Sequence, residues 1–148
     1  MSMESVPRSF GVALEGRLGQ AYNEEVFRYF LTLERKRAAR SRRSCLLLLV
    51  SVKEQPGVSG PISPVAADGI FSGLWLGVRE VDLIGWFREE RVVGAILAQG
   101  AHPPAPDISR RIGQRITETL RGCVPSDVAG RLQVRVLQLR PPQSSSAT

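Results

Sequence analysis

The sequence predicts an α+β fold of the ferredoxin-like type, in which helices pack against a four-stranded, mostly antiparallel sheet. Three observations favour this class. Apolar residues recur at helical spacing after residue 20, a short apolar run follows over residues 45–50, and two further apolar runs flank a charged turn at residues 88–91. The order of elements is helix, strand, helix, strand–turn–strand, helix, strand, which is typical of this class.

The elements in the first half of the chain are predicted from their apolar spacing. Residues 1–19 are expected to be loosely ordered, and a helix is predicted from Gln20 onward. Residues 44–52, SCLLLLVSV, form an apolar run without alternation, as expected of a strand buried on both faces. The apolar residues at helical spacing in the first helix are Tyr22, Val26, Phe30 and Leu33, with Phe27 and Leu31 widening the stripe.

A loop rich in proline and glycine, a second helix and a hairpin follow. The helix is predicted over residues 65–78, although it contains three glycines, which are unfavourable in a helix. The hairpin spans residues 78–97, and its turn, residues 88–91, is charged where glycine or asparagine is usual. The side chains expected to face the core from the helix are Val65, Ile70, Leu74 and Trp75.

The last helix and strand show the clearest periodicities. Asp107 is predicted to cap a helix over residues 108–124. Residues 131–140 alternate between apolar and polar, which predicts a strand with one solvated face near a sheet edge. Residues 141–148 are expected to be a disordered tail, so one domain spans residues 20–140. The apolar face of the helix is formed by Ile108, Ile112, Ile116 and Leu120.

Composition restricts the classes of function. The 148 residues are enough for one domain with a substantial core, and 20 Lys+Arg against 14 Asp+Glu give a net charge of +6. Nearly all the basic residues are arginine, which pairs well with phosphate. However, acidic residues are interspersed among them, as on an ordinary solvated surface. Cys45 and Cys123 lack metal-ligand spacing and His102 is the only histidine, so no zinc site is expected.

Neither a membrane span nor a secretory signal is predicted. The longest apolar run, residues 45–50, is far too short to cross a bilayer. The first residues contain no basic segment followed by an apolar stretch. We therefore expect a cytoplasmic protein.

Two segments resemble the GGDEF family of diguanylate cyclases, whose fold is nucleotide-cyclase-like. Residues 33–52, LERKRAARSRRSCLLLLVSV, resemble the segment in which the family's E..RA.R pattern precedes its buried strand. Residues 82–97, DLIGWFREERVVGAIL, resemble the hairpin that reads D.v.RyGGDEFvvlL in the family. The resemblance extends over about residues 20–140, and it includes degenerate domains found alongside bacterial exopolysaccharide sugar transferases. The residues that match E..RA.R are Glu34, Arg37, Ala38 and Arg40.

The resemblance implies that the catalytic chemistry of the family is absent. The five signature positions carry Arg88, Glu89, Glu90, Arg91 and Val92. The family's two glycines let the backbone approach the triphosphate, whereas Arg88 and Glu89 add side chains there. Val50 and Val52 stand in the places of the family's metal-binding acids, and a lone Glu90 does not make a two-metal site. We expect no catalytic residues, no metal, no cofactor and no enzymatic activity.

One ligand site of the family has a counterpart in this chain. The family's inhibitory product site, R..D, ends five residues before the signature, and Arg79 and Asp82 match it. Arginine can donate two hydrogen bonds to guanine, and a carboxylate can accept from its ring N–H and amino groups. Arg79 and Asp82 are therefore candidate ligands of cyclic-di-GMP, with Arg79 on the preceding helix end or turn and Asp82 opening the strand. The alternative is that an arginine-rich chain contains this pattern by chance.

The sequence leaves two functions open. The first is a non-catalytic regulatory or interaction module in bacterial polysaccharide synthesis or cyclic-di-GMP signalling. Its partner would be a sugar transferase, another protein of polysaccharide synthesis, or a second copy in a homo-oligomer. The alternative is an arginine-rich module that binds nucleic acid or another polyanion through residues 35–43 and 110–121. The absence of aromatic–basic interleaving and of a recognised nucleic-acid motif disfavours this alternative.

Overall fold

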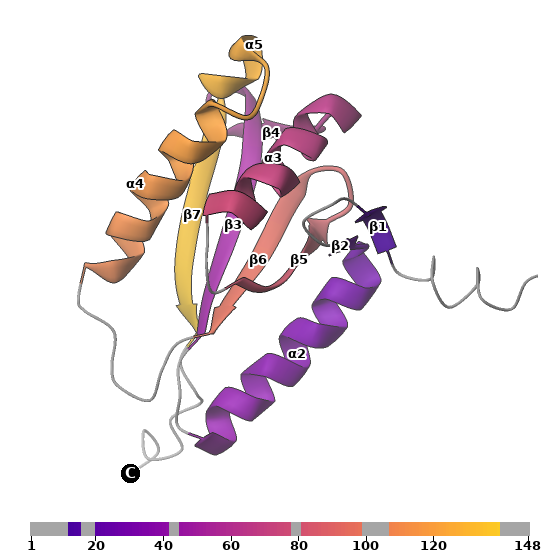
Figure 1. Cartoon of the computed structure of the whole chain (residues 1–148), viewed down its shortest axis with the longest axis vertical. Coiled ribbons are helices and arrows are strands. Elements are labelled where there is room, and N and C mark those ends of the chain that lie inside the picture. Colours follow the sequence, from indigo (N-terminus) through magenta and orange to yellow (C-terminus); the bar gives the residue numbers. More distant parts are fainter. Residues whose placement is uncertain (1–11, 16–19, 42–44, 78–80, 99–106, 140–148) are drawn as a thin grey trace, which may run out of the picture.

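One sheet runs through the centre of the molecule (Figure 1). The residues that the computed structural model describes are 12–15, 20–41, 45–77, 81–98 and 107–139. In these residues seven strands form the sheet, in the order β1-β2-β5-β6-β3, with β4 and β7 also paired to β3. All neighbouring strands are antiparallel except β2 and β5. The strands are β1 (Val12–Glu15), β2 (Gln20–Tyr22), β3 (Cys45–Gln55), β4 (Val58–Gly60), β5 (Val81–Arg88), β6 (Val92–Ala98) and β7 (Leu132–Leu139).

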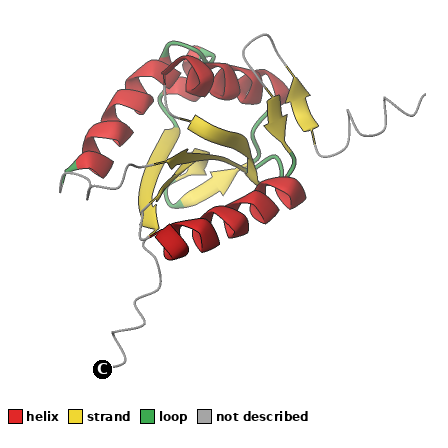
Figure 2. Cartoon of the chain, turned by 60° about the horizontal axis from the view of Figure 1, so that its bottom comes forward, coloured by secondary structure: helices red, strands yellow, loops and turns green. Residues whose placement is uncertain are grey.

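The helices of the described residues cover both faces of this sheet. α2 lies across one face, and α3 and α4 lie across the other (Figures 1 and 2). α5 is a single turn of helix between α4 and β7. The helices are α2 (Glu24–Ser41), α3 (Pro64–Gly77), α4 (Ile108–Arg121) and α5 (Ser126–Ala129). None of them is both long enough and apolar enough to cross a membrane.

β3 lies inside the sheet and is buried on both faces, as predicted. It pairs with β6 on one side and with β7 on the other. Leu46 and Leu48 are fully buried in the core beneath α3 and α4, whereas Leu47 lies with Phe27 in the core beneath α2. Because successive side chains enter two different cores, this strand carries an apolar run without alternation.

The α+β class is confirmed, but the sheet is larger than the four strands expected. Of the two hairpin strands, only β6 lies beside β3, and β5 lies beyond it. β1, β2 and β4 occupy residues for which the sequence predicted a loosely ordered segment, the start of a helix and a loop. Each of them has only three or four residues, too few to show the alternation from which a strand is predicted.

α2 begins at Glu24, four residues later than predicted from Gln20. Its start is set by Asn23, whose side-chain oxygen accepts a hydrogen bond from the Val26 N–H at 2.9 Å. This is the usual contact of an N-terminal helix cap, because the first N–H groups of a helix have no partner within it.

The side of α2 that faces the sheet also differs from the predicted one. Phe27 is fully buried and Ala38 is 6% exposed, whereas Phe30 and Leu33 are each 37% exposed. The helix carries apolar residues on two sides, and the side centred on Phe27 packs against the sheet.

α3 and α4 follow the prediction, with one correction in each helix. In α3, Ile70 and Leu74 are fully buried, but Val65 is 67% exposed because it lies on the opposite side of the helix. Trp75 is half-buried and lies 6.3 Å from Phe71 between ring centroids.

In α4, Ile116 and Leu120 are buried, and Ile108 and Ile112 pack partly buried beside them, as predicted. Asp107 stands at the start of α4, but its side chain makes no capping hydrogen bond. Instead its carboxylate lies 3.7 Å from the Arg110 guanidinium and 3.6 Å from that of Arg111. Both contacts are exposed ion pairs within one helix turn, which contribute little to stability.

β7 is an edge strand, as predicted, because within the described part of the chain it pairs with β3 only. The predicted tail, residues 141–148, lies outside the described residues. The predicted domain limits therefore remain predictions.

Gly94 allows α2 to approach the sheet closely. A Cβ atom at this position would lie 2.7 Å from Cζ of Phe27, well inside normal contact distance. Phe27 is fully buried and makes the centre of the core beneath α2. A side chain at Gly94 would therefore displace this ring.

We expect Gly94→Ala to destabilise the protein by about 1–3 kcal/mol, as overpacking of a core does. Gly130→Ala is the matched control, because a Cβ there meets nothing within 4 Å and the backbone φ is −76°. This control should be neutral or stabilising by up to about 1 kcal/mol. Urea unfolding of both variants checks the prediction, and equal midpoints would contradict the packing of Phe27 over Gly94.

Candidate functional site

The hairpin turn between β5 and β6 is closed by the Arg91 N–H, which donates a hydrogen bond to the Arg88 carbonyl at 3.0 Å. Glu90, the third residue of this four-residue turn, has a φ of 61°. A positive φ at the third position is the conformation that type II turns usually assign to glycine or asparagine. Such a conformation costs a glutamate about 1 kcal/mol or more, so the surroundings must hold it.

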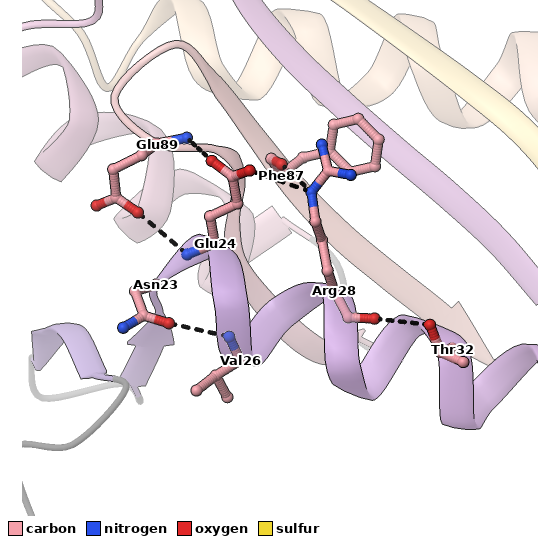
Figure 3. A network of polar contacts seen from close by, with 7 residues as sticks. All are labelled: Asn23, Glu24, Val26, Arg28, Thr32, Phe87 and Glu89. Carbon is pink, nitrogen blue, oxygen red and sulfur yellow. Dashed lines mark hydrogen bonds and ion pairs between the residues drawn. The ribbon is translucent and has the colours of Figure 1, made fainter.

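The turn is joined to the N-terminus of α2 by two reciprocal hydrogen bonds (Figure 3). The Glu24 N–H donates to the Glu89 carboxylate at 3.1 Å, and the Glu89 N–H donates to the Glu24 carboxylate at 2.6 Å. Both donors are backbone groups that the helix and the hairpin leave unpaired. The partial positive charge at a helix N-terminus favours a carboxylate there.

Arg28 strengthens this junction one turn further along α2 (Figure 3). Its Nε donates to the Phe87 carbonyl at 2.9 Å and lies 3.3 Å from the Glu24 carboxylate. The guanidinium carbon also lies 4.5 Å from the centroid of the Phe87 ring, at cation–π distance. We call Glu24, Arg28, Phe87 and Glu89 the turn–helix junction. Its groups are partly exposed, so each contact is modest by itself.

The opposite side of the turn is held by the segment before α3. The Ile62 N–H donates to the Glu90 carbonyl at 2.7 Å. Arg91 lies beside the same segment, with its Nη1 3.5 Å from the Ser59 carbonyl oxygen. The turn is therefore fixed on two sides, and this explains how Glu90 keeps a positive φ.

Val50 and Val52, which the sequence resemblance aligns with the family's metal-binding acids, are part of the core. Val50 is fully buried and Val52 is 4% exposed. Val50 pairs with Val93 on β6 and Val134 on β7, so apolar side chains surround it within the sheet. No group of three or more histidine, cysteine, aspartate or glutamate residues able to hold a metal occurs in the described residues.

The predicted guanine site is only partly within the structure. Arg79 lies outside the described residues. Asp82 belongs to β5, at an irregularity of the pairing between Val81 and Leu83, and its side chain is not described. The structure therefore does not test whether the two side chains lie together, and the site remains a prediction.

The sequence did not predict that Glu24 and Arg28 contact the turn. They lie 65 and 59 residues from their partners Glu89 and Phe87, and no local pattern shows such a pairing. Asn23 followed by two glutamates was the available signal, because a capping residue before acidic residues marks a helix N-terminus.

A second candidate surface is a groove of about 910 Å³ between α4 and β7. Its walls include Arg110, Arg111, Arg115 and Arg121 of α4, and Val134 and Val136 of β7. Glu118 also lines it, and Arg115 donates a hydrogen bond to the Gly77 carbonyl at 3.2 Å. The groove therefore has a positive wall and an apolar floor.

Comparison with known proteins establishes the fold. No family model and no curated protein matches the chain. The diguanylate cyclase SiaD from Pseudomonas aeruginosa, solved in complex with its activator SiaC, is similar in structure, with a TM-score of 0.61 and 18% sequence identity. The match covers 93% of this chain and 54% of that chain, so this chain spans about half the length of SiaD. The FimX GGDEF domain from the same organism is 16% identical over 90% of this chain and 84% of its own, with a TM-score of 0.49.

The chain thus has the nucleotide-cyclase-like fold of GGDEF domains, as the resemblance implied. The hairpin turn that the sequence resemblance aligns with the family's signature is also the turn that contacts α2 in this structure.

We expect Glu89→Ala to lower the free energy of unfolding by about 1 kcal/mol, because it removes a charged acceptor from the first turn of α2. Glu89→Gln keeps an acceptor and should lose less. The matched control is Asp68→Ala, an exposed acidic residue of α3 outside the first turn of that helix, which should change stability by no more than about 0.5 kcal/mol. Chemical unfolding measures all three, and equal effects of Glu89→Ala and Asp68→Ala would contradict the junction.

Proposed function

We propose that this chain is a non-catalytic member of the GGDEF family that acts as a regulatory or interaction module. The burial of Val50 and Val52, at 0% and 4% exposure, carries this proposal. A divalent cation requires oxygen ligands, and a valine supplies none. The place at which the family holds its metal ions is therefore filled with apolar side chains.

The turn–helix junction supports the same function. Glu89 stands at a glycine position of the signature, where the family's backbone approaches a triphosphate. Here its carboxylate is hydrogen-bonded to the N-terminus of α2. A phosphate at this place would meet a negative charge that the chain itself supplies, and the two would repel each other.

The partner of such a module would be another protein. SiaD was solved in complex with a protein activator, which provides a precedent for a protein partner of this fold. We propose a cytoplasmic role in bacterial polysaccharide synthesis or cyclic-di-GMP signalling, with a sugar transferase or another protein of polysaccharide synthesis as the partner. This proposal rests on the resemblance of the hairpin and of the segment before β3.

We expect no cyclic-di-GMP to form from GTP in the presence of Mg²⁺ or Mn²⁺, because Val50 and Val52 of β3 supply no oxygen ligand for a metal ion. Chromatography of the reaction products, compared with a heat-inactivated sample, is the measurement. Product above that background, abolished by Glu90→Ala, would show that the remaining acid supports catalysis and would overturn the proposal.

The groove between α4 and β7 favours a second candidate function, the binding of a polyanion. Four arginines line it against a single glutamate. Nucleic acid or another polyanion bound there would release counterions, so its affinity would fall steeply with salt.

Calorimetry with cyclic-di-GMP on the wild type, Arg79→Ala and Asp82→Ala separates these functions. If the two residues bind guanine, each substitution weakens binding about tenfold or more, because each removes charged hydrogen bonds. Equal affinities that fall with salt would indicate capture by the arginines of the groove. We expect no wild-type heat above buffer, which would leave the protein-interaction function.

A further inference from the structure

α2 presents apolar side chains on the side away from the sheet. Tyr29 is 62% exposed, and Phe30 and Leu33 are each 37% exposed. The Phe30 ring lies 5.7 Å from that of Tyr29 and 5.8 Å from that of Tyr22, so the aromatic surface is continuous. α2 lies on the opposite side of the sheet from α3 and α4 (Figure 2). Large apolar side chains gathered in contact with water mark an interaction surface.

The charges on the same side of α2 follow an order. The spacings of four, four, three and four residues place five exposed side chains on one side of a helix with 3.6 residues per turn. We call them the outer face of α2. An acid stands at its N-terminal end, two apolar side chains follow, and two basic residues stand at its C-terminal end. In order, they are Glu25, Tyr29, Leu33, Lys36 and Arg40.

This order is complementary to itself when a second helix runs in the opposite direction. When Tyr29 of one copy lies opposite Leu33 of the other along the helix axis, Glu25 of the first copy lies opposite residue 37 of the second. Lys36 and Arg40 of the second copy then lie within about one helix turn of Glu25 along the axis. A two-fold axis repeats every contact, so both ends of the pair join opposite charges. A parallel pair would instead bring Glu25 against Glu25 and lysine against lysine.

We propose that the outer face of α2 binds the same face of a second copy of this chain, in antiparallel orientation. The 18-residue helix is about 27 Å long, and a pair of such helices buries less than the roughly 800 Å² per partner of a standard interface. The dimer therefore dissociates on dilution. The inference does not depend on the loss of catalysis, and its readout is the mass of the particle rather than enzymatic activity.

Sedimentation equilibrium of the full chain over a range of concentrations tests this proposal. We expect the wild type to dimerise, and Glu25→Lys to weaken the dimer about tenfold or more, because it places like charges together at both ends. The double variant Lys36→Glu, Arg40→Glu should weaken it similarly. An equimolar mixture of the two proteins should restore the dimer, since each end then joins opposite charges again.

Two further variants distinguish this interface from nonspecific association through exposed apolar side chains. Leu33→Ser removes an apolar contact of the outer face and should weaken the dimer. Leu76→Ser removes an equally apolar side chain from α3, 67% exposed, and should leave it unchanged. All of these residues are exposed, and circular dichroism would check that each variant keeps its fold.

A wild type that remains monomeric at every concentration would overturn the proposal. A dimer that responds to Leu76→Ser but not to the α2 variants would overturn it as well. A mixture that fails to restore the dimer would exclude the antiparallel pairing.

Discussion

The burial of β3 on both faces is the constraint on which the rest of the structure depends. From Leu46 to Val50 its side chains alternate between the core beneath α3 and α4 and the core beneath α2, and every one of them is apolar. A carboxylate at Val50 or Val52 would lie within the first of these cores. An uncompensated charge there is strongly unfavourable, by several kcal/mol. The proposed lack of catalysis agrees with the way apolar side chains complete the core at these two positions.

The position of α2 links the core to the hairpin turn. Phe27 enters the space that Gly94 leaves open, and this contact fixes the distance between the helix and the sheet. Its N-terminus then reaches the turn, where Glu24 and Glu89 exchange hydrogen bonds. One side of α2 thus covers the core around Phe27, and its first residues hold the hairpin turn between β5 and β6. Its remaining side, with Tyr29 and Leu33, is left toward solvent.

The pattern of apolar residues predicts most of the long elements correctly. It does not decide which way a helix faces when the helix has apolar residues on two sides. β3 is predicted from an uninterrupted apolar run, and α4 and β7 are each predicted from one dominant period. α2 carries two apolar sides, and no local feature of its sequence decides which one faces inward. The orientation of α2 depends instead on Gly94, far away along the chain, which leaves room for the Phe27 ring. The sequence predicted a charged turn and placed the candidate ligand residues at Arg79 and Asp82. The contacts that α2 makes at the turn join residues 59 and 65 positions apart, beyond any local pattern.

The hairpin turn keeps a residue with positive φ without using glycine. Glu90 adopts a φ of 61°, which a glutamate keeps only where neighbouring contacts over-determine the backbone. Those contacts come from Ile62 on one side and from the junction with α2 on the other. Helix N-termini are common sites for bound anions, since their N–H groups are unpaired. Here Glu89 supplies the anion from within the chain, so an external phosphate would have to displace it. A turn whose own carboxylate already occupies the helix N-terminus is better suited to join two elements of the protein than to bind a nucleotide.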